Sequence, residues 1–131
     1  MVDYRTARVF LLLILTQAAH SAEEYATKLY AVFPPAHFVS SLISHDLGLG
    51  FLIANAALVA FGLWCWAVPV RLRWIFAPEV VWFWIVLEFA NGTTHGALAL
   101  LSRGYFPGLI TAPVLVAVAI WLARAQLRVR E

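Results

Sequence analysis

The chain has 131 residues, of which 63% are hydrophobic and only 12% are charged, and its formal net charge is +2. Soluble domains are about half apolar and a quarter charged, so this imbalance indicates a surface that faces lipid. The basic residues stand at the ends of apolar segments, which leaves no basic face for nucleic acid. The single cysteine, Cys65, excludes an internal disulfide and a cysteine-based zinc site.

The first apolar segment runs from Val9 to Ala19 and is followed by His20, Glu23 and Glu24. Its basic start, apolar run and small-residue AAHSA sequence fit a secretory signal peptide that is cleaved just before the two glutamates. They also fit a membrane helix that continues to residue 29. The local pattern leaves both interpretations open.

Three further segments are long enough to cross a bilayer, which requires about 20 apolar residues. Leu47 to Val70 contains 24 residues without a charge, and Gly104 to Ala123 contains 20, whereas Trp74 to Ser102 carries Glu79 and Glu88. Together with the first segment, they predict an all-α fold, an antiparallel bundle of four transmembrane helices. We expect these helices at about 7–29, 44–67, 74–101 and 108–124, within a single domain over residues 1–131.

Prolines give expectations for the connections between these helices. Pro34 and Pro35 are expected to prevent a helix in the loop that follows the first span. Pro107 is expected in the first turn of the fourth helix, and Pro113 is expected to bend that helix.

The basic residues are divided unequally between the two ends of the predicted bundle. Seven arginines fall on the side of both termini, against only Lys28 and Arg103 on the other side. The positive-inside rule therefore predicts that both termini are cytoplasmic. We expect a multi-pass protein whose partner is the lipid bilayer, located in the cytoplasmic membrane of a bacterium.

The ionisable residues of the first and third helices are concentrated at one depth. On the first helix, His20, Glu23 and Glu24 have the i, i+3, i+4 spacing of a single face. On the third helix, Glu88, Asn91 and His95 have i, i+3, i+7 spacing. A charge near the bilayer centre costs about 2.5–3.5 kcal/mol, so both sets are expected to turn inward and line a polar pocket.

Four other residues are expected to lie at the rim of this pocket or to allow the helices around it to pack closely. His45 and Asp46 begin the second helix at the rim of the pocket, where they form either a helix cap or part of the site, with His45 or Asp46 as a further metal ligand. Gly92 and Gly96 on the third helix predict the close approach of a neighbouring helix.

Three short motifs occur in order along the chain. They are H-x-x-E-E at residues 20–24, N-x-x-x-H at residues 91–95 and Y-x-P-G-x-x-T at residues 105–111. With these motifs the chain resembles the HXXEE family of small integral membrane proteins. The resemblance implies that the H-x-x-E-E segment stays in the mature protein. The polar motifs of the family suggest an enzyme, and the family has no established activity to carry over.

Four functional interpretations remain open. The first is an enzyme with a divalent metal (zinc, iron or manganese) that acts on a lipid-like or other apolar small molecule. The expected metal ligands are His20, Glu23, Glu24, His45, Glu88 and His95. The expected catalytic residues are Glu23, Glu24, Glu88 and Asn91. The others are metal-free acid–base catalysis by desolvated glutamates, proton-coupled transport, and polar contacts that only fix helix packing. The pattern leaves the oligomeric state open.

Overall fold

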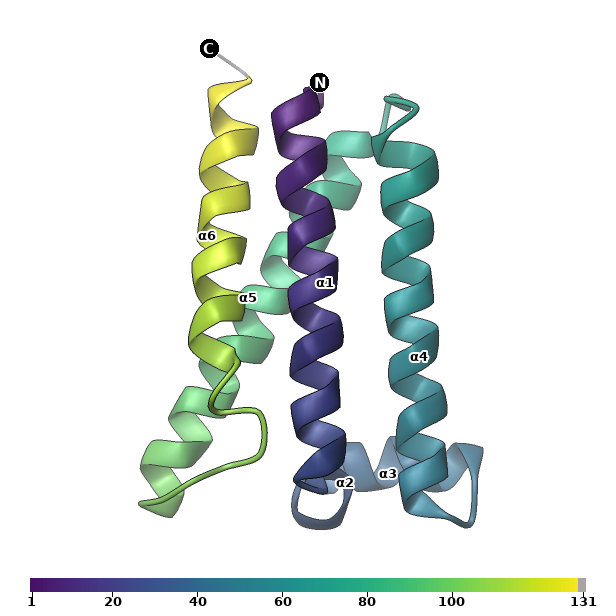
Figure 1. The fold of residues 1–131 in the computed structure, drawn as a ribbon, viewed down its shortest axis with the longest axis vertical. Coiled ribbons are helices and arrows are strands. Elements are labelled where there is room, and N and C mark those ends of the chain that lie inside the picture. The colour runs from purple at the N-terminus through teal and green to yellow at the C-terminus, as the bar shows by residue number, and fades with distance from the viewer. Residues whose placement is uncertain (130–131) are drawn as a thin grey trace.

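The described residues of the computed structural model, 1–129, form six α-helices and one π-helical turn, with no strand among them. The four long helices are α1 (Tyr4–Ala26), α4 (Leu47–Cys65), α5 (Ala77–Ser102) and α6 (Ala112–Arg128). They run in alternating directions, so the start of α1 and the end of α6 lie at the same end of the molecule (Figure 1). The predicted all-α class is confirmed.

Two short helices, α2 (Leu29–Val32) and α3 (Pro34–Ile43), lie across the opposite end of the bundle (Figure 1). The expectation that Pro34 and Pro35 prevent a helix is wrong. They occupy the first positions of α3, where a backbone N–H has no helical partner and the φ of proline is already helical.

Asp46 caps α4 by accepting a hydrogen bond of 3.1 Å from the backbone N–H of Leu49, which confirms the cap interpretation for this residue.

The other prolines also correct the expected boundaries. The last long helix begins at Ala112 rather than near residue 108, because Pro107 lies in the connection that precedes it. Pro113 stands in the first turn of α6 and therefore does not bend it. Pro69 lies within the π-helical turn η1 (Trp66–Val70), which continues α4 to the end of its apolar stretch.

The core is formed where α1 packs between α4 and α6 while α5 crosses behind it (Figure 1). Phe10 and Trp84 are fully buried there, with their rings edge to face and 6.3 Å between centroids. Gly92 permits the contact of α5 with α6, because a Cβ at this position would be 3.0 Å from the backbone oxygen of Ala112. The same expectation for Gly96 is wrong, since a Cβ there would have no neighbour within 4 Å.

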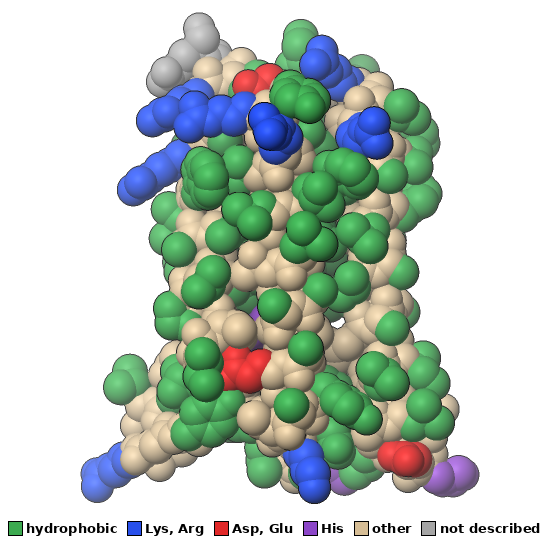
Figure 2. All heavy atoms as spheres, in the orientation of Figure 1, with side chains coloured by type: hydrophobic (Ala, Val, Ile, Leu, Met, Phe, Trp, Pro, Cys, Tyr) green, Lys and Arg blue, Asp and Glu red, His purple; other side chains and the backbone are tan. Residues whose placement is uncertain are grey.

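The outer surface carries many large apolar side chains. Figure 2 shows hydrophobic side chains across the middle of one face, with lysine and arginine side chains near its two ends. Exposed members include Leu52, Ile53, Phe83, Val86, Val114 and Trp121. One helical stretch of residues 1–129, Leu47–Val70, is long and apolar enough to cross a membrane.

Candidate functional site

Three buried side chains from two helices meet near the α3 end of the bundle. They are His20 and Glu24 of α1 and His95 of α5. Glu24 Oε1 lies 3.3 Å from His20 Nε2 and 2.9 Å from His95 Nε2, and the centroids of the two perpendicular imidazole rings are 4.7 Å apart. One ligand atom of each residue lies within 4.8 Å of the others, so this three-residue group could hold a metal ion.

The connection between α5 and α6 holds the other nitrogen of each imidazole. His95 Nδ1 is 2.5 Å from the carbonyl oxygen of Pro107, and His20 Nδ1 is 2.7 Å from Thr111 Oγ1. A carbonyl oxygen only accepts, so the proton of a neutral His95 is on Nδ1. The Thr111 hydroxyl donates to Glu23, so it accepts from His20 Nδ1. In each ring, when it is neutral, Nε2 therefore carries no proton, and its lone pair faces Glu24.

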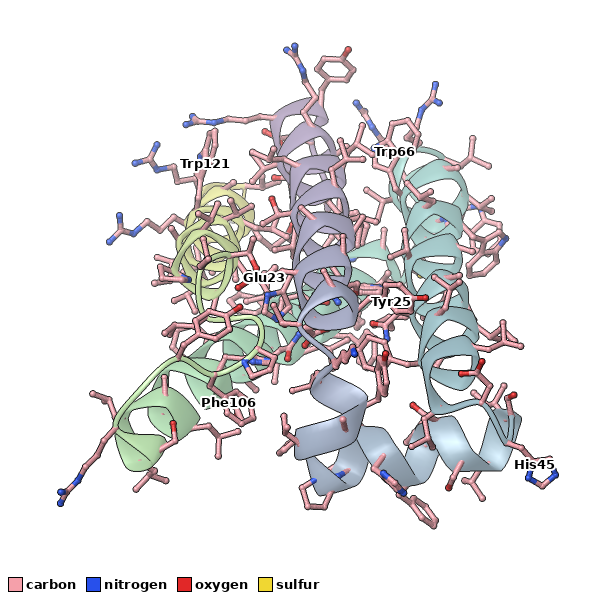
Figure 3. The ribbon with its side chains drawn as sticks, turned by 60° about the horizontal axis from the view of Figure 1, so that its bottom comes forward. Glu23, Tyr25, His45, Trp66, Phe106 and Trp121 are labelled. Carbon is pink, nitrogen blue, oxygen red and sulfur yellow. The ribbon has the colours of Figure 1, made fainter. Side chains whose placement is uncertain are left out.

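Glu23 lies outside the three-residue group and serves the start of α6 instead (Figure 3). Its carboxylate accepts hydrogen bonds from the backbone N–H groups of Ile110 and Thr111, at 3.0 and 2.9 Å, and from the Tyr105 hydroxyl at 2.6 Å. Negative charge is favoured at a helix N-terminus, where backbone N–H groups lack partners. Partial desolvation, together with the bond to Glu23, raises the pKa of Tyr105, so its phenol keeps the proton that it donates.

Gly108 packs directly against the two imidazoles. Its φ is +90°, a value that L side chains rarely adopt, and an added Cβ would be 2.7 Å from His95 Nδ1 and 2.8 Å from His20 Cε1. The four defined positions of the third sequence motif thus contact either the histidines or Glu23. They are Tyr105, Pro107, Gly108 and Thr111.

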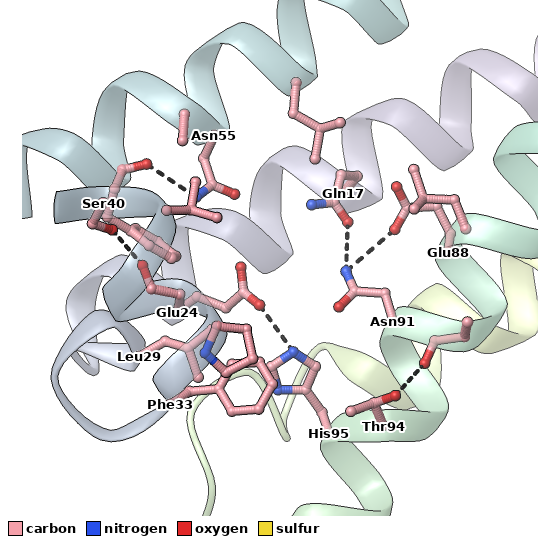
Figure 4. Close-up of a pocket in the computed structure, with 18 residues that line it drawn as sticks. Gln17, Glu24, Leu29, Phe33, Ser40, Asn55, Glu88, Asn91, Thr94 and His95 are labelled. Atoms are coloured by element: carbon pink, nitrogen blue, oxygen red, sulfur yellow. Dashed lines mark hydrogen bonds and ion pairs between the residues drawn. The ribbon is translucent and has the colours of Figure 1, made fainter. Parts of the chain in front are cut away.

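A cavity of about 650 Å³ adjoins the three-residue group, and Glu24 and His95 line it (Figure 4). Most of the residues that line it are apolar, and they come from α1, α2, α3, α4 and α5. Apolar lining residues include Leu29, Phe33, Val39, Phe51, Leu58 and Leu87. The lining contains no lysine or arginine. A site of this size and polarity suits an apolar small molecule with few polar groups.

A chain of hydrogen bonds between polar side chains crosses the bundle at this cavity. The Asn91 amide donates to Gln17 Oε1 at 3.3 Å and to Glu88 Oε2 at 3.4 Å (Figure 4). Gln17 in turn donates to Ser21, and Ser21 donates to Asn55 of α4. Glu88 is fully buried, and its Oε1 has no hydrogen-bond partner among the described residues. An unpaired buried carboxyl oxygen is costly, so Glu88 is available to a ligand in the cavity.

The structure separates the predicted site residues into four places. His20, Glu24 and His95 form the three-residue group, whereas Glu88 and Asn91 line the cavity outside it. Glu23 binds the turn that precedes α6, as described above. His45 is exposed at the start of α4 and points away from the cavity, so the structure does not bring it to the other histidines (Figure 3).

Several residues that contribute to the site were not predicted from the sequence. Gln17 and Ser21 share the buried stripe of α1 with His20 and Glu24, a 17–20–21–24 spacing that was visible in the sequence. Thr16 on the same helix and Thr27 at its C-cap bond only to carbonyls of that helix. The carbonyl of Pro107 had no sequence signal, because any residue supplies one.

Comparison with known proteins gives one match. A family model described as "Protein of unknown function with HXXEE motif" matches residues 11–122. No curated protein and no solved structure matches the chain. The matched region contains all three motifs, and with them every residue of the three-residue group.

Proposed function

Because this chain belongs to the HXXEE family, for which no activity is described, we propose from the geometry of the site that it is a membrane-embedded metalloenzyme acting on an apolar small molecule. The observation that carries the proposal is the convergence of lone pairs from His20, Glu24 and His95.

A bound cation accounts for this convergence. With both Nδ1 atoms committed as donors, neutral Nε2 lone pairs would repel the Glu24 carboxylate at 2.9–3.3 Å. Either a metal ion or a proton on Nε2 relieves that repulsion, and the metal analysis below distinguishes the two. Ligand histidines in metal sites usually donate the other ring N–H to a carbonyl or another fixed acceptor, as His95 does here. The second ring is held in the same way by Thr111.

The spacing of the ligand atoms is near that of a small divalent ion. Atoms bound at about 2.0–2.2 Å to a tetrahedral ion are about 3.3–3.6 Å apart. The 3.3 Å from Glu24 Oε1 to His20 Nε2 matches this range, and the 2.9 Å to His95 Nε2 would have to lengthen slightly on binding. Two imidazoles and one carboxylate leave one position of a tetrahedral ion open, which is the arrangement of catalytic rather than structural zinc sites. A divalent ion there would polarise a bound substrate oxygen or acidify a bound water.

The cavity supports the choice of substrate. An apolar chain can lie between α3, α4 and α5, while a polar group reaches Glu24 and His95. Glu88 lies seven residues before His95 on α5, which is about 10 Å along the helix axis. We assign to Glu88 and Asn91 the contact with a second polar atom of the substrate, or a proton transfer to it.

Membrane insertion is supported by surface chemistry and by helix length. Large apolar side chains are exposed on every long helix, and within residues 1–129 Leu47–Val70 alone has the length and hydropathy of a span. Some of the polar residues that lower the hydropathy of α1 and α5 are buried against other helices, namely Gln17, His20, Glu24, Glu88 and His95, whereas Glu79, Thr93 and Thr94 are exposed. Lysine and arginine near the ends in Figure 2 fit a bilayer around the middle.

Metal analysis of the purified protein tests the proposal. The protein is expressed with zinc, iron and manganese supplied, extracted in a neutral detergent and measured by mass spectrometry of the elements. We expect about one ion per chain, and less than a tenth of that in Glu24→Ala and His95→Ala, because each change removes one of three ligands. His37→Ala and His45→Ala, which remove exposed imidazoles, serve as matched controls.

A second measurement keeps this test independent of folding. Cobalt added to metal-free protein should give the visible absorption of a four-coordinate site, and His95→Ala should lose it while its melting temperature stays near that of the control variants. Wild-type protein that binds none of the four ions would contradict the metal proposal and favour metal-free acid–base chemistry.

A further inference from the structure

A second pocket lies at the opposite end of the molecule from the three-residue group. It has a volume of about 530 Å³ and is bounded by the start of α1 and by η1 with the turn that follows it. Three arginines line it: Arg8, Arg71 and Arg73. We define this basic pocket by its full lining, which also includes Asp3, Tyr4, Ala7, Leu11, Trp66 and Val70.

Aromatic rings hold two of these guanidinium groups in place. The guanidinium carbon of Arg71 is 5.0 Å from the centroid of the Trp66 ring, and that of Arg8 is 5.5 Å from the centroid of the Tyr4 ring. Trp66 is itself fixed, since its indole N–H donates to the backbone oxygen of Ala7 at 3.1 Å. Figure 3 shows Trp66 just beyond the end of α4, at the start of η1. The guanidinium groups of Arg8 and Arg71 are therefore held against aromatic rings.

No carboxylate in the described part of the chain forms an ion pair with these arginines. Within residues 1–129, the short carboxylate contacts to basic side chains are those of Glu24 with His20 and His95. Asp3 lines the pocket, but its carboxylate accepts a 2.7 Å hydrogen bond from the Thr6 backbone N–H and caps α1. Three cations around one cavity repel one another, and a bound anion would relieve that repulsion.

We propose that the basic pocket binds the phosphate of an anionic phospholipid. The same lining offers apolar surface from Leu11, Val70 and the Trp66 ring, which suits the glycerol and the first carbons of an acyl chain. Tyrosine and tryptophan at this level match the head-group region of a bilayer, and basic pockets between helices on the cytoplasmic side bind anionic head groups. A zwitterionic head group fits less well, because its ammonium would face the arginines.

Lipid-dependent thermal stability tests the proposal. The full chain in neutral detergent is titrated with phosphatidylglycerol, with phosphatidylcholine or with inorganic phosphate. Phosphatidylglycerol should raise the melting temperature of the wild type, and Arg71→Gln/Arg73→Gln should bind it about 30-fold more weakly, at about 1 kcal/mol for each lost arginine. Arg124→Gln/Arg128→Gln removes the same charge from exposed positions outside the pocket and should behave as the wild type.

Other outcomes overturn the proposal in distinct ways. Equal loss in both double variants would mean a general charge effect, and an equal shift with inorganic phosphate would mean an anion site without lipid specificity. An equal rise in melting temperature with phosphatidylcholine would show that the arginines do not select the lipid. Should the Arg71/Arg73 variant fail to fold, native mass spectrometry of the wild type decides, since it should retain phosphatidylglycerol in preference to phosphatidylcholine. None of these results depends on the metal site.

Discussion

Adjacent glutamates on α1 have different tasks because consecutive helical residues point about 100° apart. Glu24 faces the cavity and the two histidines, whereas Glu23 accepts hydrogen bonds from the start of α6. The two tasks are linked through Thr111, whose hydroxyl donates to Glu23 and accepts from His20. His20 and His95 are thus oriented by the connection between α5 and α6, which contributes no residue to the three-residue group.

Thr111→Val tests that link at one residue. The change keeps the shape of the side chain but removes the oxygen that holds His20 Nδ1, so we expect metal affinity to fall about 10- to 100-fold. Thr111→Ser should retain most of the affinity. Thr93→Val is the control, because its hydroxyl bonds only to carbonyls of its own helix. Unchanged affinity in Thr111→Val, measured by competition with a metal-binding dye, would show that Thr111 does not orient the ligand.

At the scale of helices, the site depends on how closely α5 and α6 approach. His95 belongs to α5, while its Nδ1 partner, the Pro107 carbonyl, precedes α6. Gly92 lies about one turn before His95, where a Cβ would meet α6, and Gly96 lies one residue after His95, where a Cβ would have no neighbour within 4 Å. These two glycines allow the same substitution to be compared in two environments on one helix.

Gly92→Ala should destabilise the protein and Gly96→Ala should not. The Cβ at position 92 would be 2.6 Å from Val116 Cγ2 and 3.0 Å from the Ala112 oxygen, and such overpacking costs about 1–3 kcal/mol. At position 96 nothing is displaced, so the higher helix propensity of alanine should give about 0.5–1 kcal/mol of added stability. Unfolding in a denaturing detergent measures both, and similar values for the two variants would disprove the close contact.

At the scale of the whole molecule, the proposed insertion defines two ends with different chemistry. The start of α1 and the end of α6 lie at the same end of the molecule as the basic pocket. The short helices α2 and α3 and the three-residue group lie toward the other end (Figure 1). A substrate dissolved in the bilayer could then reach the cavity without entering water. The basic pocket would contact lipid head groups of the inner leaflet.

Cysteine labelling tests this orientation. Cys65 is buried and is replaced by alanine, and single cysteines are then introduced as Ser41→Cys on α3 and Leu72→Cys beside the basic pocket, both at exposed positions. A membrane-impermeant maleimide should label Ser41→Cys in intact cells and Leu72→Cys only after permeabilisation, because the proposed orientation puts them on opposite sides. The reverse pattern would invert the topology, and labelling of both in intact cells would contradict insertion.

The sequence alone determined the helical class, the approximate positions of the four long helices and the two helices that carry the polar residues. These features follow from composition and from the 3.6-residue period, which are local properties of the chain. The three motifs also led to the family that the comparison found. The sequence did not reveal that proline begins α3 and stands in the first turn of α6, because the same residue both ends and starts helices.

Only the tertiary structure decided which polar residues meet. Spacing put Glu23 and Glu24 on the same face of one helix, and the position of α6 separated their roles. His45 was an equally good ligand by type, yet α4 places it on the surface. The acceptors that hold Nδ1 of His20 and His95 could not be identified from residue types, since one of them is a backbone carbonyl in a distant connection. Local pattern determines which face a residue occupies, and packing between helices determines what that face contacts.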